Sequence, residues 1–147
     1  MSSEPFEQIR RLKARYFRCI DTKDWVGLRD VLCEDVEIDV AADSGRRYSG
    51  ADAFVASVQR VLSDAVSVHH GHMPEIELTS PTTATGIWSM EDELWFPEGA
   101  PVRYLHGYGH YYETYHLDAD GSWRIASMRL ERLRRDVLPN PDPSPAE

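Results

Sequence analysis

The stretch that decides the fold is VRYLHGYGHYYETYHL, residues 102–117. Aromatic and β-branched residues are frequent in it and it holds no proline, so it is expected to form one long strand. Asp118-Ala119-Asp120-Gly121 follows as a hairpin signal, and a last strand is expected from Trp123 to about Leu133. Two earlier stretches also read as strands, and they are residues 66–78, with a bulge or a sheet edge at Pro74, and residues 84–96.

The N-terminal part is predicted to be mainly helical. In residues 6–20 apolar side chains recur at helical spacing and basic side chains, Lys13 among them, fall between, which indicates an amphipathic helix. Shorter helices are expected at 25–32 and 54–62, with a strand between them at 36–40. Helices followed by a strand meander predict an α+β fold, in which N-terminal helices pack on a curved, mainly antiparallel sheet that encloses a pocket.

Length and charge limit the class of protein. The chain has 147 residues and a formal net charge of -9, which fits one domain, expected at residues 1–135, with a proline-rich tail at 136–147. Such acidity disfavours nucleic-acid binding, and no apolar run is long enough to span a membrane. Two cysteines and the absence of a basic-then-apolar leader pattern lead us to expect a cytoplasmic protein without a disulfide framework.

Tyr16 and Asp21 are the first candidate site residues. An ideal helix turns side chains at this spacing about 140° apart, so a shared site requires the helix to end near Asp21. The run Asp21-Thr22-Lys23-Asp24 allows such an end. The alternative is that Asp21 caps the second helix and Tyr16 belongs to the core.

The run Val68-His69-His70-Gly71-His72 holds three histidines. Adjacent strand residues point to opposite faces, so these rings diverge and no metal site is expected. A strand histidine is usually hydrogen-bonded structure, whereas one that faces a pocket with a carboxylate behind it is a general base. The sequence leaves open whether His70 or His72 joins His69 in a site.

Asp92 shares a strand face with apolar residues that include Trp88, and a carboxylate on such a face needs a partner. The alternative is a parity shift that places Asp92 in solvent. In the next strand one face carries polar aromatic side chains that either line a wet pocket or cover a subunit contact, namely His106, Tyr108, His110 and Tyr112. Gly107 and Gly109 opposite them indicate a close backbone approach or a bend.

Several blocks resemble a known family. Residues 13–25 are similar to the first helix of SnoaL-like proteins in the NTF2-like superfamily, and this block also resembles scytalone dehydratases. Residues 69–76 and 83–92 are similar to bacterial bile-acid 7α-dehydratases. The resemblance runs from about Ile9 to Arg135 and implies an NTF2-like or cystatin-like cone around one pocket.

The resemblance also implies roles for single residues. Tyr16 corresponds to a tyrosine that binds or polarises the substrate oxygen, Asp21 to a carboxylate that orients the catalytic histidine, and His69 to that histidine. His110 corresponds to a second active-site histidine of scytalone dehydratases. Asp92 corresponds to a pocket carboxylate and Arg132 to a functional arginine of the bile-acid dehydratases. Apart from the resemblance, the side chains also expected to contact substrate are Trp88, His72, Tyr108 and Tyr112.

The expected function is a cofactor-independent lyase that dehydrates a hydrophobic, steroid- or polyketide-like cyclic hydroxy ketone. A neutral His69 would take the proton next to the carbonyl, with Asp21 fixing its tautomer and Tyr16 donating a hydrogen bond to the enolate oxygen. Alternatives are an isomerase, a cyclase, an epoxide hydrolase that uses Asp92 with an arginine, or a non-catalytic ligand-binding or assembly module. The resembling dehydratases imply a homo-oligomer, a trimer in preference to a dimer.

Overall fold

The computed structural model describes residues 4–141. In chain order its elements are α1 (Glu4–Asp21), α2 (Trp25–Asp30), β1 (Leu32–Val40), α3 (Ala41–Ser44), β2 (Arg46–Ser49), α4 (Ala51–Leu62), β3 (Val66–Ser80), β4 (Thr83–Trp95), β5 (Val102–Leu117) and β6 (Trp123–Pro139).

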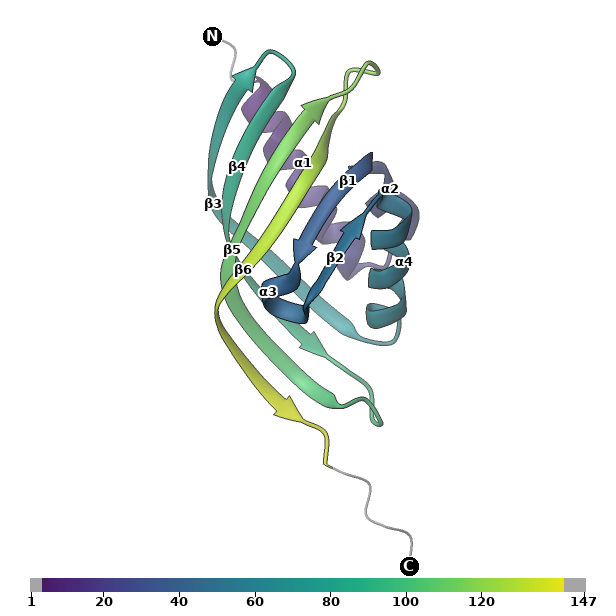
Figure 1. The fold of residues 1–147 in the computed structure, drawn as a ribbon. Coiled ribbons are helices and arrows are strands. Elements are labelled where there is room, and N and C mark those ends of the chain that lie inside the picture. The colour runs from purple at the N-terminus through teal and green to yellow at the C-terminus, as the bar shows by residue number, and fades with distance from the viewer. Residues whose placement is uncertain (1–3, 142–147) are drawn as a thin grey trace, which may run out of the picture.

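The strands form one mixed sheet in the order β2-β1-β6-β5-β4-β3. Neighbouring strands are antiparallel except β1 and β6, which run parallel. Figure 1 shows β3 to β6 bending along their length, with α1 against one half of the sheet and α2 and α4 beside β1 and β2. This arrangement confirms the predicted α+β cone of NTF2-like type. We call the sheet face toward these helices the inner face.

Alternating burial along β4 and β5 defines that inner face. Buried Trp88 and Met90 alternate with half-buried neighbours in β4, and buried Leu105, Tyr111 and Tyr115 do so in β5. Apolar residues of α1 cover the same core, which confirms its amphipathic pattern. Lys13 departs from that pattern, because its side chain is buried instead of lying on the polar face.

The junction between α1 and α2 decides where Asp21 points. The helix ends at Asp21, and Lys23 then takes a left-handed conformation with φ 59°. Asp24, and not Asp21, caps α2 by accepting a hydrogen bond of 2.9 Å from the Gly27 amide. The alternative in which Asp21 caps α2 is therefore wrong, and its carboxylate is available to the sheet.

Two other expectations need correction at the edges of the fold. The last strand runs to Pro139 instead of ending near Leu133, because residues 136–139 pair with the start of β5 and do not begin the tail. Part of that tail, residues 142–147, lies outside the described residues.

The connection expected at 46–50 contains β2, paired with β1. The bulge expected near Pro74 is confirmed by a register shift between His72 and Glu75. None of the helices between residues 4 and 141 has the length and apolarity of a membrane span.

Candidate active site

A cavity of about 370 Å³ lies between the inner face of the sheet and the helices α1 and α4. Much of its wall is apolar and comes from Ile20, Phe54, Val58, Leu62, Leu94 and Leu130. The polar side chains that reach it include Tyr16, Tyr111, His69, Asp92 and Arg132. A pocket of this size and composition suits one small, largely apolar molecule that a few polar groups orient.

His69 lines this cavity and is hydrogen-bonded to Asp21 at the end of α1. Asp21 Oδ1 lies 2.7 Å from His69 Nδ1, and Oδ2 accepts a hydrogen bond of 2.8 Å from the His69 backbone amide. The Ser67 hydroxyl donates a third hydrogen bond, of 2.9 Å, to Oδ1. Because an ionised carboxylate only accepts hydrogen bonds, Nδ1 of a neutral His69 carries the proton and Nε2 is left as the basic atom.

Two elements hold this imidazole in place. Phe17 of α1 stacks on it with ring centroids 6.2 Å apart and planes 16° apart, and only 9% of the His69 side chain is exposed. The neighbouring β4 brings Asp92 to the other side, where Oδ2 lies 3.9 Å from His69 Nε2. His69 therefore sits between two carboxylates, one touching Nδ1 and one near Nε2.

Asp92 and Arg132 form a buried, two-pronged ion pair. Arg132 donates hydrogen bonds of 2.8 and 2.9 Å to the two carboxylate oxygens of Asp92, which is 3% exposed. It donates a third, of 2.7 Å, to Asp43 of α3. Burial alone would lower the pKa of Arg132, but the hydrogen bonds and charges of Asp92 and Asp43 outweigh it and raise that pKa, so the guanidinium stays charged.

Tyr16 is a hydrogen-bond donor that borders the cavity. Burial raises its pKa well above the ordinary value, and the charges of Glu113, Asp21 and Asp92 add to the rise, so the phenol stays protonated. Its hydroxyl makes no hydrogen bond to another group within residues 4–141, yet no side-chain oxygen in that range is both sealed from solvent and unpartnered. The hydroxyl must therefore face the open space of the cavity.

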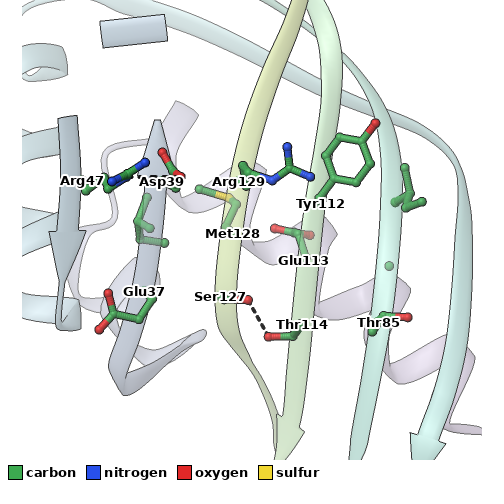
Figure 2. A pocket seen from close by; sticks show the side chains of 13 residues that line it. Glu37, Asp39, Arg47, Thr85, Tyr112, Glu113, Thr114, Ser127, Met128 and Arg129 are labelled. Atoms are coloured by element: carbon green, nitrogen blue, oxygen red, sulfur yellow. Dashed lines mark hydrogen bonds and ion pairs between the residues drawn. The ribbon is translucent and has the colours of Figure 1, made fainter. Parts of the chain in front are cut away.

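Three expected site residues lie on the outer face of β5, away from the cavity. Tyr108, His110 and Tyr112 alternate with the buried inner residues, so the expectation that they line this pocket is wrong. Figure 2 shows Tyr112 and Arg129 at a separate hollow. The Arg129 guanidinium lies 4.4 Å from the centre of the Tyr112 ring. The expectation failed because both faces of β5 are rich in aromatic residues, so the pattern does not distinguish them. In the structure the face that carries Gly107 and Gly109 is the inner one. The other interpretation of the stripe, a subunit contact, stays a prediction.

The remaining histidines of β3 and Trp88 also lie outside the cavity. His72 is exposed on the outer face and meets Glu91 at 3.3 Å. His70 is exposed too, and with Asp21, His69 and Trp88 it borders a separate hollow of about 480 Å³. Trp88 is on the inner face but belongs to the core under α1, where its indole nitrogen donates to the Tyr115 hydroxyl at 2.8 Å. Strand alternation put Trp88 on the correct face, but the cavity occupies only part of that face.

Sequence reasoning missed several polar groups of the cavity wall, among them Arg46, Tyr111, Asp43 and Tyr48. Asp43 comes from α3, in a segment with no clear pattern, and is recognised only through its contact with Arg132. Tyr48 of β2 reaches the cavity and accepts a hydrogen bond of 2.7 Å from Ser57 of α4. Nowhere in residues 4–141 do three His, Cys, Asp or Glu side chains converge as ligands of one metal ion.

Comparisons with known proteins agree with this fold. The model of the SnoaL-like domain family matches residues 2–129. The probable cyclase FGR4 of Gibberella zeae is 24% identical over an alignment 147 residues long, which covers 94% of this chain and 97% of the relative. A putative scytalone dehydratase from Novosphingobium aromaticivorans superposes with a TM-score of 0.81 at 21% identity, covering 97% of this chain and 95% of that one. The hexachlorocyclohexane dehydrochlorinase LinA-type3 from Novosphingobium barchaimii superposes with a TM-score of 0.78 at 18% identity, covering 92% and 90%.

Proposed function

The chain belongs to the SnoaL-like domain family, and from this premise we propose that it is a cofactor-independent lyase that removes water from a neutral, hydrophobic cyclic hydroxy ketone. The observation that carries the proposal is the contact of 2.7 Å between Asp21 and His69 Nδ1, which leaves Nε2 free as a base at an apolar cavity. The names of the relatives support an elimination, because they include a dehydratase and a dehydrochlorinase.

The reaction begins with proton transfer to His69. Nε2 takes the proton from the carbon next to the ketone, and the electron pair of that C–H bond moves toward the carbonyl oxygen to form an enolate. Asp21 and Asp92 stabilise the imidazolium that results, at 2.7 and 3.9 Å from its two nitrogens. The Tyr16 hydroxyl donates a hydrogen bond to the enolate oxygen.

The same histidine completes the elimination. The enolate collapses, the carbon–carbon double bond forms, and the C–O bond of the hydroxyl on the next carbon breaks. Nε2–H returns its proton to that departing oxygen, which leaves as water. The base is then neutral again, so one side chain serves as base and acid and the sum of the steps is loss of H₂O.

A panel of neutral cyclic β-hydroxy ketones tests the proposal. Formation of the conjugated enone is followed by absorbance and by the loss of one water in the mass of the product. His69→Ala and Asp21→Asn should each lower kcat/KM about 10²–10⁴-fold, the usual contribution of a positioned general base. His110→Ala is the matched control, because this histidine lies on the outer face.

Two results would contradict the proposal. One is a substrate whose turnover is unchanged in both His69→Ala and Asp21→Asn. The other is binding of panel members without any turnover by the wild-type protein, which a ligand-binding module would give.

A second candidate reaction, hydrolysis of an epoxide, is favoured by one observation. Arg132 lies between Asp92 and Asp43, so two carboxylates and a cation stand together at the cavity, where they suit activation of water and opening of the ring. Incubation in ¹⁸O-labelled water separates the two reactions, since only hydrolysis carries the label into the product. Loss of the hydrolytic activity in Asp92→Asn with retention in His69→Ala would favour this second reaction.

A further inference from the structure

A buried lysine lies directly behind the polar end of the cavity. Lys13 of α1 has 0% relative exposure, and its Nζ donates a hydrogen bond of 2.9 Å to Glu113 of β5, which is also buried. The same nitrogen lies 3.7 Å from the sulfur of Met128. The amphipathic pattern predicted Lys13 on the polar side of its helix, and that expectation is wrong because its partner lies on a strand 100 residues away in the sequence.

Aromatic rings close the rest of the space around this ammonium. Its nitrogen lies 3.9 Å from the ring centre of Tyr16, 3.8 Å from that of Tyr111 and 4.7 Å from that of Phe17. A cation over ring faces is attracted by their negative charge density, most strongly where water is excluded. Lys13 thus sits in a cage of three rings, one carboxylate and one sulfur, which replaces its hydration shell.

The cage adjoins the cavity as well as the core. Both Tyr16 and Tyr111 line the cavity, and the Lys13 ammonium lies over the rings of both. Glu113 is fixed in turn by the Tyr115 hydroxyl, which donates to it at 2.8 Å and accepts from Trp88. A chain of contacts therefore runs from the core under α1 through Glu113 and Lys13 to the phenol that meets the substrate.

We propose that Lys13, with Glu113 as its counter-ion, is a positioning residue that sets the orientation of the Tyr16 ring and strengthens the hydrogen bond that its hydroxyl donates into the cavity. The inference rests on the function proposed above, in which that hydrogen bond meets an enolate oxygen. A positive charge at the ring face withdraws electron density from the phenol, and this makes the hydroxyl a stronger donor. The benefit is largest when the acceptor carries the negative charge of the enolate, so it lowers the barrier more than it tightens substrate binding.

Burial and nearby charges change the pKa of both Lys13 and Tyr16 in this cage. Burial lowers the pKa of Lys13, and the charge and hydrogen bond of Glu113 oppose that change. The groups that raise the pKa of Tyr16 besides burial are Glu113, Asp21 and Asp92, all of them negative. Lys13 Nζ lies 3.9 Å from the ring centre of Tyr16, and in this proposal its charge opposes that of the three carboxylates.

The wild type and three variants separate the effect of the buried charge on activity from its effect on stability. Lys13→Met leaves Glu113 as an uncompensated buried charge and is expected to be destabilised. The double variant Lys13→Met with Glu113→Gln removes both charges at similar volume, and such paired replacement of a buried ion pair is often neutral or stabilising. Arg15→Met is the control, because it removes an exposed cation from the same helix. Urea unfolding establishes which variants are as stable as the wild type.

Two readouts are then made on the stable variants. The first needs no substrate: the ¹³Cζ signal of Tyr16, assigned through Tyr16→Phe in protein labelled at tyrosine, should shift in the double variant and stay in place in Arg15→Met. The second is turnover of a substrate found with the hydroxy ketone panel. The double variant should lose about 10–100-fold in kcat with KM little changed, less than the 10²–10³-fold expected when a donor to the oxyanion is removed outright.

Each outcome bears on the inference in one direction. A double variant that is stable, with the Tyr16 signal and kcat both unchanged, overturns it and leaves Lys13 as a packing residue. A change in KM alone also overturns it, since that would mean a role in binding. A shifted Tyr16 signal in a protein that turns over no hydroxy ketone refutes the proposed function but supports the action of Lys13 on Tyr16.

Discussion

Adding one methyl group at Gly107 should break the buried pair of Asp92 and Arg132. Gly107 lies on the inner face of β5, and a Cβ there would lie 2.0 Å from Arg132 Nη1 and 2.6 Å from Asp92 Oδ1. Since carbon and nitrogen atoms normally approach to about 3.5 Å, the guanidinium must move by about 1.5 Å to make room. The backbone at Gly107 needs no left-handed conformation, so the whole effect of Gly107→Ala comes from this collision.

The size of the effect follows from what the collision breaks. Arg132 would lose its hydrogen bonds of 2.8 and 2.9 Å to a carboxylate that is 3% exposed. Breaking such a buried pair costs about 3–5 kcal/mol, and because the Arg132 side chain retains some exposure we expect about 3 kcal/mol for Gly107→Ala. For a domain of this length, that loss corresponds to a fall in Tm of about 6–12 °C.

A double-mutant cycle isolates the cause. Urea unfolding is measured for Gly107→Ala, for Arg132→Ala and for the two together. Once Arg132 is truncated, the added methyl meets only the end of Asp92, so it should cost less than about 1 kcal/mol and the cycle should show a coupling of about 2 kcal/mol. Gly27→Ala is the control: its Cβ would lie 2.5 Å from Asp24 Oδ2 and 2.8 Å from Cys19 Sγ, away from Arg132, so its cost should be the same in both backgrounds.

Additive costs would refute this reasoning. If the losses of unfolding free energy in the two single variants sum to the loss in the double variant within about 0.5 kcal/mol, the need for glycine at position 107 does not come from Arg132. The same conclusion would follow if Gly107→Ala were as stable as the wild type.

Other measurements check further parts of the structure. Stability should fall as pH rises above about 10, because burial raises the pKa of Tyr16, Tyr111 and Tyr115 and the folded state keeps protons that the unfolded chain releases there. That contribution is complete below pH 10, so phenolate absorbance should appear together with the loss of circular dichroism and not before it. Burial raises the pKa of Cys33 to about 11, so near neutral pH its alkylation by iodoacetamide should be no faster than unfolding. Replacing His110 by alanine should leave the Tm of the protein within about 2 °C of the wild-type value, since the ring is partly exposed on the outer face.

The parts of the fold that were predictable from sequence are those with a local period. Strand alternation placed Asp92 on the inner face, and the helix breaker after Asp21 fixed the end of α1. The pairing of Asp21 with His69 was expected only from the resemblance to dehydratases. The end of α1 and the face of Asp92 were predictable without it. They depend on residues close in the sequence, where periodicity is informative.

The parts that failed depend on contacts between distant segments. The two faces of β5 have similar aromatic patterns, and the choice between them is made by the room that Gly107 gives to Arg132 of β6. Lys13 resembles a surface residue until Glu113 is brought beside it. Asp43 carries no pattern of its own. In each case a charged side chain is buried because its partner is a residue that local sequence does not reveal.

The charged groups in the cavity wall and behind it also limit which substrates the site can bind. Four carboxylates lie in the cavity wall or behind it, on Asp21, Asp43, Asp92 and Glu113, and the cations there are Lys13, Arg132 and Arg46. Lys13 and Arg132 are already held by these carboxylates, so neither is free to bind an anionic ligand without breaking a buried pair. A negatively charged substrate would therefore meet repulsion at the buried end of the cavity, where its cationic partner would have to be Arg46, which is exposed to solvent. A neutral ketone makes charge only as it reacts, when His69 becomes positive between two carboxylates and Tyr16 faces the enolate, so the arrangement favours the transition state over any charged ground state.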